Sequence, residues 1–203
     1  MKQRTLAVVS AGLSQPSSTR LLADQIGEAV RRELELGGTQ VDVRVVELRD
    51  LAHDLVNNML TGFPSADLKR AIDDVTLADG VVAVTPIFGA SYSGLFKSFF
   101  DVLDKEALVD KPVLIAATGG TARHSLALEH AVRPLFSYLR SVVVPTTVFA
   151  ATEDFGGSEH ADLARRIDRA AGELAALVAA RESSGPVDPF DSPVPFEELL
   201  AGN

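Results

Sequence analysis

Residues 5–30 read TLAVVSAGLSQPSSTRLLADQIGEAV and hold an apolar run, a hydroxyl-rich loop and a helical pattern, in that order. The run Leu6–Ser10 is apolar almost throughout, which is typical of a strand covered on both faces of a parallel sheet. Beyond the loop, apolar side chains recur at four-residue steps, the spacing of one helix face: Leu22, Ile26, Val30 and Leu34. Ser18 or Thr19 can cap this helix. The stretch therefore predicts a strand, a loop at its carboxyl end, and a helix.

The same alternation of apolar runs and helical patterns continues along the chain. Four more runs follow: Val41–Leu48, Gly80–Thr85, Pro112–Thr118 and Val142–Ala150. The first of these four partly alternates between apolar and polar residues, so we expect it near a sheet edge. Repeated strand–helix units predict an α/β fold, with a five-stranded parallel sheet and helices on both faces. The order 2-1-3-4-5 is the first expectation, and five- or six-strand Rossmann orders remain open.

Further helices are expected on the same periodic grounds. They are the helix capped by Ser65, the helix after Gly94, a helix over about 125–140 and a helix over about 159–183. Because proline lacks an N–H, we expect a kink or a restart at Pro134. In the last helix, the residues expected to face the core are Leu163, Ile167, Leu174 and Leu177.

The composition limits the classes of function. The chain has 203 residues, 46% of them hydrophobic, and a formal net charge of −9. An acidic surface argues against nucleic acid and against an anionic membrane surface as partners. No apolar stretch approaches the length of a membrane span. The absence of cysteine excludes thiolate catalysis, cysteine-ligated metal and disulfides, and we expect a cytoplasmic protein without a metal site.

The end of the chain differs in composition from the rest. Residues 185–203 read GPVDPFDSPVPFEELLAGN and are rich in proline and acidic residues. Residues 1–184 are therefore expected to form one domain, and residues 185–203 an extended or poorly ordered C-terminal extension. Phe190 and Phe196 are candidates for contact with a neighbouring subunit.

The first loop, Ser10–Arg20, contains no acidic residue although the chain is acidic. In such a sheet, ligands bind beyond the carboxyl ends of the strands, where a helix N-terminus offers unpaired N–H groups. The loop adds further donors: the hydroxyls of Ser10, Ser14, Ser17, Ser18 and Thr19, and the guanidinium of Arg20. We interpret the loop as a pocket for a terminal phosphate; a flexible loop with a simple helix cap is the alternative. Neither the P-loop motif nor the dinucleotide fingerprint is present, so a mononucleotide is favoured.

The loop after the third run reads TPIFGASYSGLFKSFFD, residues 85–101. Pro86 stiffens the turn, and Gly89 and Gly94 permit a positive φ or a close backbone approach. Aromatic and hydroxyl side chains lie between them: Phe88, Ser91, Tyr92 and Ser93. Such a surface suits a flat heterocycle with polar edges, and a plain strand–helix turn with core aromatics is the alternative. The serines do not fit the spacing of a nucleophile elbow.

The loop after the fourth run reads TGGTARHSLALEH, residues 118–130. Gly119 and Gly120 allow a pair of backbone N–H groups to face a ligand. His124 is expected at the start of the next helix. There it lies either beside the ligand or at the surface without a role.

Taken together, the three loops resemble the NAD(P)H-dependent FMN reductase family, which has a flavodoxin-like three-layer fold. The stretches that carry the resemblance are SAGLSQPSSTRLLA, TPIFGASYSGLFKSFFD and ATGGTARHSLALEHAVRPLFSYL. The third stretch is most similar to the actinobacterial reductases that are partnered with luciferase-like monooxygenases. The resemblance implies FMN as cofactor and NADPH or NADH as co-substrate.

The resemblance also implies which residues form the site. The FMN phosphate would lie against Ser10, Gly12, Ser14, Ser17, Ser18, Thr19 and Arg20. The flavin ring would lie against Pro86, Ile87, Phe88, Ser91, Tyr92 and Ser93, with Thr118, Gly119, Gly120 and His124 beside it. His124 would position the reacting rings rather than transfer a proton. Many relatives have tyrosine at the position of Phe88, so a hydroxyl contact made there is absent in this chain.

The implied activity is hydride transfer from the nicotinamide to flavin N5, in which the cofactor carries the chemistry. Reduced flavin would then supply a partner monooxygenase. Two alternatives remain: a reductase of quinones, azo compounds or chromate that retains FMN, and a non-enzymatic flavodoxin-type electron carrier. A receiver-type phosphoacceptor would need an acidic pair after the first strand, and the sequence has none there. We expect a homodimer or homotetramer, because a flat ligand at a loop edge leaves a face that a second subunit can close.

Overall fold

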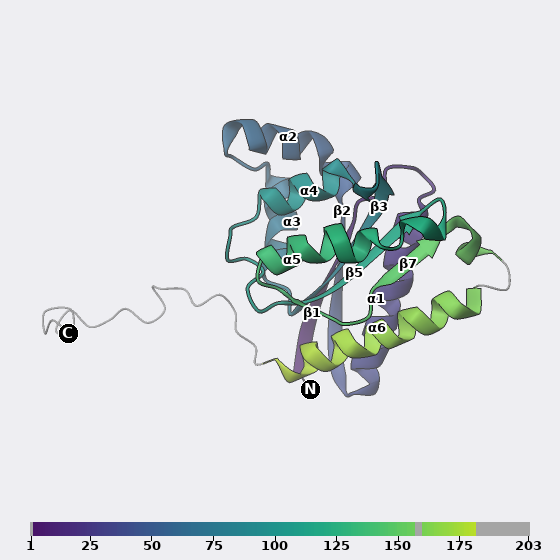
Figure 1. Ribbon diagram of the computed structural model, residues 1–203. Helices are drawn as coiled ribbons and strands as arrows, with labels where there is room; N and C mark the ends of the chain where they lie inside the picture. Colours follow the sequence, from purple (N-terminus) through teal and green to yellow (C-terminus); the bar gives the residue numbers. More distant parts are fainter. Residues whose placement is uncertain (1, 157–159, 182–203) are drawn as a thin grey trace, which may run out of the picture.

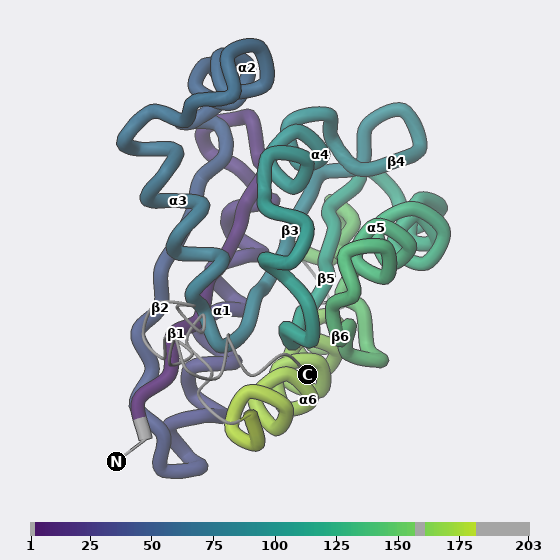
Figure 2. Tube along the Cα trace, turned by 90° about the vertical axis from the view of Figure 1, so that its left-hand side faces the viewer, coloured from purple at the N-terminus to yellow at the C-terminus, as the bar shows by residue number. Residues whose placement is uncertain are grey.

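The computed structural model describes residues 2–156 and 160–181, which form a central sheet between two layers of helices (Figures 1 and 2). The long strands are parallel and lie in the order β2 (Thr39–Glu47), β1 (Lys2–Ser10), β3 (Gly80–Phe88), β5 (Pro112–Gly119). Two short strands, β6 (Val142–Val143) and β7 (Val148–Ala151), pair in parallel with β5 on its other side. The predicted α/β fold is confirmed, with its five runs in the order 2-1-3-4-5.

Different helices cover the two faces of the sheet. One face carries α1 (Ser18–Leu36) and α6 (His160–Ala180); the other carries α3 (Ala66–Thr76), α4 (Gly94–Asp101) and α5 (Arg133–Tyr138). In β1, Leu6 and Val8 are buried with the first pair of helices, whereas Ala7 and Val9 are buried with the other three. Successive strand residues point to opposite faces, so one apolar run contributes to two cores.

The run Val142–Ala150 is not one strand, as predicted, but two. β6 pairs with the start of β5 and β7 pairs with its end, and Pro145 lies between them. Proline has no N–H for a ladder hydrogen bond, so the strand is interrupted there. The guanidinium of Arg133 donates to the carbonyls of Val144 and Pro145, at 3.2 Å each.

The helical region after β5 is also more broken than predicted. In place of a helix over 125–140 the chain forms a 3-10 turn at Ala122–His124, a π-helical turn at Leu128–Val132, and α5 from Arg133. Pro134 lies in the first turn of α5 and cannot donate to the carbonyl four residues before it. The expected restart at this proline is therefore confirmed.

One helix of the structure, between β2 and the helix that Ser65 caps, was not predicted. The chain leaves β2 through a 3-10 turn, Leu48–Leu51, and forms α2, Ala52–Thr61, before the predicted helix that Ser65 caps. Only Leu55 of α2 is buried. Apolar residues do recur at helical spacing in this segment, at Leu55, Val56, Met59 and Leu60, but all except Leu55 are exposed.

In α6, Leu177 is not a core residue, contrary to prediction. Its side chain is 36% exposed, whereas Val178 is fully buried. An α-helix has 3.6 residues per turn, so the inward position after Leu174 falls on Val178. Val178 lies over Gly80 of β3, where an added Cβ would come within 2.5 Å of it.

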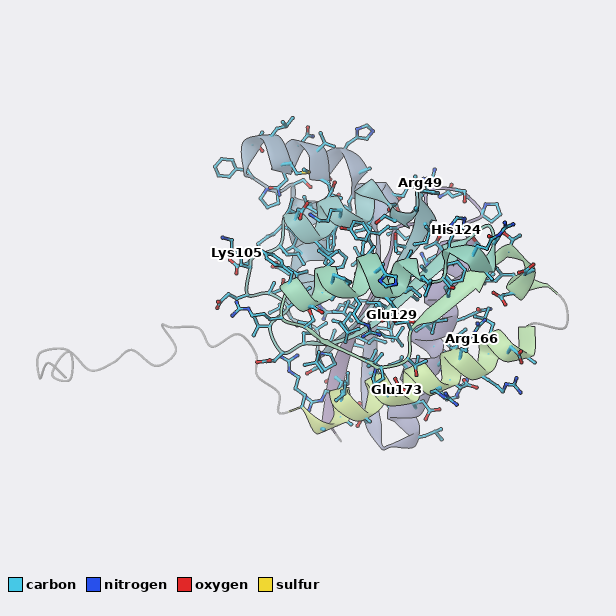
Figure 3. The ribbon with its side chains drawn as sticks, viewed as in Figure 1. Arg49, Lys105, His124, Glu129, Arg166 and Glu173 are labelled. Carbon is cyan, nitrogen blue, oxygen red and sulfur yellow. The ribbon has the colours of Figure 1, made fainter. Side chains whose placement is uncertain are left out.

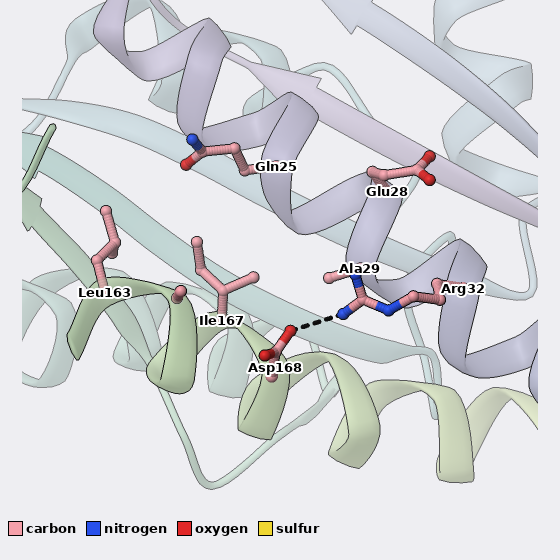
Figure 4. Close-up of a pocket in the computed structure, with 8 residues that line it drawn as sticks. Gln25, Glu28, Ala29, Arg32, Leu163, Ile167 and Asp168 are labelled. Atoms are coloured by element: carbon pink, nitrogen blue, oxygen red, sulfur yellow. Dashed lines mark hydrogen bonds and ion pairs between the residues drawn. The ribbon is translucent and has the colours of Figure 1, made fainter. Parts of the chain in front are cut away.

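Helices α1 and α6 lie side by side and leave a groove of about 250 Å³ between them (Figure 4). The Arg32 guanidinium donates to the Asp168 carboxylate across the groove, at 2.7 Å. The lining comes from the middle of α1 and the first half of α6. The groove is thus a feature of helix packing, set apart from the loop at the start of α1.

Two predictions lie outside the described residues. These are the domain boundary after residue 184 and the C-terminal extension with Phe190 and Phe196. The predicted last helix is described as far as Ala180. Among the helices that the structure describes, none is long and apolar enough to cross a membrane.

Candidate functional site

The three loops singled out in the sequence all leave the carboxyl edge of the parallel sheet. They follow β1, β3 and β5, which are neighbours in the sheet. Figure 3 shows His124, from the third loop, at this end of the molecule, with Arg49 of the turn after β2 nearby in the view. Ligands of doubly wound sheets bind at such an edge, where the chain order reverses.

The first loop is built around a glycine and a serine. Ser17 caps α1, and its Oγ accepts from the Arg20 N–H at 3.2 Å. A Cβ on Gly12 would overlap Ser17 Oγ and lie 3.1 Å from Thr19 Cβ, so any other residue there would displace the hydroxyl that caps α1. The first turn of α1 holds no acidic residue, which leaves the positive end of the helix dipole available to an anion.

Ser10 lies at the end of β1 with a hydroxyl that has no partner among the described residues. The residue is 1% exposed and its Oγ makes no hydrogen bond in that part of the chain. A buried hydroxyl without a partner is costly unless something else satisfies it. An oxygen of a bound ligand beside the first loop would do so. Ser14 and Ser18 of the same loop are exposed.

Arg20 does not extend its guanidinium freely over the first loop. Its Nε donates to Asp24 at 2.8 Å, and its Nη1 donates to Glu47. These contacts raise the pKa of Arg20, the hydrogen bond to Asp24 being the largest cause. The sequence did not indicate Glu47, which lies 27 residues away. The parallel register pairs it with Ser10, so a loop without acids in sequence has a carboxylate beside it in space.

The second loop is a hairpin. Ile87 pairs with Tyr92 and Phe88 with Ser91, in an antiparallel pairing of β3 with the short strand β4. The two turn residues, Gly89 and Ala90, both have positive φ, at 54° and 67°. The predicted positive φ of Gly89 is thus confirmed. Gly94 does not have a positive φ, and the structure describes no close neighbour at the position of a Cβ on it.

Some side chains of the second loop are exposed, and others are buried or hydrogen-bonded within the protein. Phe88 is half exposed, and Pro86 is buried. Ser93 is buried and caps α4, where its Oγ accepts from the Phe96 N–H at 3.2 Å. Its own N–H donates to Thr85 Oγ1 at 3.0 Å. The role of Thr85 could not be predicted, because its contact with Ser93 forms only when the hairpin folds back.

The third loop contacts the first through two threonines. Thr118 Oγ1 lies 2.7 Å from Thr19 Oγ1, and both side chains are buried. A Cβ on Gly119 would come within 2.8 Å of Phe149, whereas Gly120 has open space around it. His124 is exposed and ends a single 3-10 turn, rather than beginning a regular helix as predicted.

These features fit a phosphorylated, flat ligand better than a metal ion. The unsatisfied Ser10 hydroxyl, the crowded turn at Gly12 and the acid-free first turn of α1 suit a phosphate. The hairpin and the open backbone at Gly120 leave room at the same edge for a ring. Within the described residues, no group of three or more His, Asp or Glu could hold a metal ion. Fold and site together define a flavodoxin-like, mononucleotide-binding protein.

Comparison with known proteins identifies the family. The model of the NADPH-dependent FMN reductase family matches residues 4–156. An FMN reductase (NADPH) of Pseudomonas aeruginosa is 38% identical over 150 residues, which cover 74% of this chain and 78% of that protein. The NADH-dependent FMN reductase SfnE of Pseudomonas putida is 34% identical over 180 residues, covering 88% and 94%. The solved structure of an oxidoreductase from Corynebacterium diphtheriae superposes with a TM-score of 0.87 at 53% identity, covering 90% of this chain and all of that one.

The chain belongs to the NADPH-dependent FMN reductase family. The expectations of an oxidoreductase, of FMN with NADPH or NADH, and of a flavodoxin-like fold are confirmed. The family model ends at residue 156, so it includes all three loops of the site.

Proposed function

We propose that this FMN reductase holds FMN across the three loops, reduces it with NADH or NADPH, and releases reduced FMN to a separate monooxygenase. The observation that carries the proposal is the first loop, where the buried Ser10 hydroxyl, which has no partner among the described residues, lies beside a turn in which a Cβ on Gly12 would overlap Ser17 Oγ. The relatives named for NADPH and for NADH are similarly distant, so the preferred nicotinamide nucleotide is left to experiment.

At the phosphate end, the proposal assigns the contacts to the hydroxyl of Ser10 and to the first N–H groups of α1. The exposed hydroxyls of Ser14 and Ser18 are further donors. Ser17 shapes the turn by capping the helix. The guanidinium of Arg20 is hydrogen-bonded to Asp24 and Glu47, so in this proposal Arg20 contributes its positive charge and not a free donor group.

At the ring end, the hairpin of β3 and β4 provides one wall, with Phe88 exposed at its tip. The backbone of Gly120 is open, so its N–H can donate to a carbonyl at the ring edge. The proposal takes His124 as a positioning group for the rings, and its support is that His124 Cβ lies 3.6 Å from the position that a Cβ on Gly119 would occupy. Bound FMN supplies the hydride-accepting chemistry.

The binding part of this proposal is tested by titrating the purified protein with FMN and with riboflavin. A phosphate held by charge-assisted hydrogen bonds should make FMN bind about tenfold to a hundredfold more tightly than riboflavin. Flavin fluorescence quenching measures both affinities. Equal affinity for the two flavins would contradict the assignment of the first loop to the phosphate.

The release part is tested by the dependence of NADH and NADPH oxidation on added FMN. If FMN is a released substrate, the desalted protein is inactive until FMN is added, and the rate saturates with FMN. An FMN-dependent monooxygenase added to the mixture should then turn over. A yellow desalted protein that reduces quinones or azo dyes without added FMN would instead identify a reductase that retains its flavin.

The proposal includes a homodimer or homotetramer and a cytoplasmic location. Several apolar side chains from the loops of the site are exposed and could contact a second subunit: Leu13, Phe88 and Leu126. Light scattering on the purified protein gives the oligomeric state, and a monomer at micromolar concentration would contradict this part.

A further inference from the structure

Thr19 and Thr118 form a buried hydroxyl pair under the candidate site. Their Oγ1 atoms lie 2.7 Å apart, although the residues are 99 positions apart in sequence. Thr19 is 3% exposed and Thr118 is 5% exposed. Thr19 belongs to the first turn of α1 and Thr118 is the penultimate residue of β5. The pair therefore joins the helix that follows the first loop to the strand that leads into the third loop.

Each threonine also touches the part of the site on its own side. Thr19 Cβ lies 3.1 Å from the position of a Cβ on Gly12, so it supports the crowded turn of the first loop. Thr118 is followed directly by Gly119, whose own Cβ position is 3.6 Å from His124 Cβ. The hydroxyl pair thus lies between the turn at Gly12, on the side of Thr19, and the start of the third loop, on the side of Thr118.

The pair has a property that separates it from an ordinary core contact. Each hydroxyl is a donor and an acceptor, and the only side-chain hydrogen bond that the structure describes for either is the one between them. Replacing one threonine by valine leaves the other hydroxyl buried without a partner, which costs stability. Replacing both by valine removes that penalty and loses only the link between the loops. Stability and the link can therefore be separated by mutation.

We infer that Thr19 and Thr118 are a positioning pair that fixes the phosphate end of the FMN site against its ring end. This inference rests on the proposed function, since it takes the first loop as the phosphate site. A ligand that occupies both ends benefits from their fixed separation, because binding one end presents the other at a high effective concentration. A ligand that lacks the phosphate gains nothing from it. The pair therefore favours FMN over riboflavin.

The experiment is a double-mutant cycle with Thr19→Val, Thr118→Val and the double variant, in which the dissociation constants of FMN and riboflavin and the thermal midpoint are measured. All three variants should bind FMN about fivefold more weakly than the wild type, which is the effect of one lost hydrogen bond. Their riboflavin affinity should fall less than about twofold. The double variant should lose no more FMN affinity than either single variant. Its thermal midpoint should be higher than those of the single variants. Thr19→Ser and Thr118→Ser keep both hydroxyls and should bind FMN like the wild type.

Thr39→Val is the matched control. Thr39 is also buried, but it begins β2 at the opposite edge of the sheet. This variant should leave the ratio of FMN to riboflavin affinity unchanged. The inference is overturned if the FMN losses of the single variants add in the double variant, or if the valine variants keep the wild-type ratio. Serine variants that bind as weakly as the valine variants would also overturn it. If the wild type itself does not prefer FMN, the proposed phosphate site fails, and the inference fails with it.

Discussion

At the scale of single residues, Gly12 is the most constrained position of the site. A Cβ there would overlap Ser17 Oγ and crowd Thr19, and Ser17 Oγ cannot move away without losing its hydrogen bond in the cap of α1. Gly12→Ala should therefore weaken FMN binding by at least about tenfold, or 1.4 kcal/mol. Riboflavin affinity should change less. Fluorescence titration of both flavins measures the effect.

Gly94 provides the control for that substitution. No atom lies within 4 Å of a Cβ built on Gly94, and the residue begins α4, where alanine is a good helix former. Gly94→Ala should bind FMN with the wild-type affinity. If Gly12→Ala also binds FMN with the wild-type affinity, the first loop rearranges freely. That result would remove the main support for assigning the first loop to the phosphate.

Ala90 is a strained residue at the tip of the hairpin. Its φ of 67° lies in the left-handed region, which costs a residue with a Cβ roughly 1–2 kcal/mol. Glycine avoids this cost but loses roughly 0.5–1 kcal/mol of backbone entropy on folding. Ala90→Gly should thus raise the free energy of unfolding by about 0.5 kcal/mol, the difference between these two terms. Urea denaturation of the two proteins tests this, and a less stable variant would show that Ala90 makes contacts that outweigh its strain.

At the scale of elements, α6 illustrates what periodicity determines. Val178 is fully buried over Gly80, whereas Leu177 is partly exposed. Val178→Ala should lower the free energy of unfolding by about 2 kcal/mol, from lost burial and the cavity that remains. Leu177→Ala should change it by less than about 0.5 kcal/mol, as substitutions on exposed faces do. The reverse ranking of the two variants in chemical denaturation would restore Leu177 to the core.

The strands were predictable and the irregular segments were not. Apolar runs identified the long strands because both faces of a parallel sheet are buried, and the partial alternation of β2 matched its place at the sheet edge. α2 was missed although Leu55, Val56, Met59 and Leu60 recur at helical spacing; the segment is only ten residues long, and the structure leaves all of these apolar side chains except Leu55 exposed. The division of the last strand depends on Pro145, a local interruption inside a run that is otherwise apolar.

At the scale of the whole molecule, the sequence predicted that the three loops leave the same edge of the sheet, but not which of their side chains meet. The carboxyl ends of parallel strands share one edge, so three unusual loops after strands were expected to converge there. The contacts of Arg20 with Glu47 and of Thr19 with Thr118 join segments 27 and 99 residues apart. Such pairs depend on strand register and on the packing of α1 against the sheet. Composition and spacing carry no information on either.

The opposite edge of the sheet holds a charge that affects the stability of the whole domain. Lys111 precedes β5, is buried, and donates to the carbonyls of Thr76 and Ala78 at 2.8 and 2.6 Å. The pKa of Lys111 is lowered from 10.5 to about 8, mainly by burial and also by the charge of Arg181, while Asp79 partly offsets the two. The folded protein therefore releases this proton at a lower pH than the unfolded chain does.

The sign of the resulting pH dependence follows from proton linkage. Between about pH 8 and pH 10.5 the unfolded chain keeps the Lys111 proton and the folded protein does not. Stability rises with pH wherever the unfolded state binds more protons. Over this interval the free energy of unfolding of the wild type should therefore rise relative to that of Lys111→Met, in which the other groups titrate alike. Urea denaturation of both proteins at a series of pH values measures the difference, and parallel profiles would show that Lys111 titrates at its ordinary pKa.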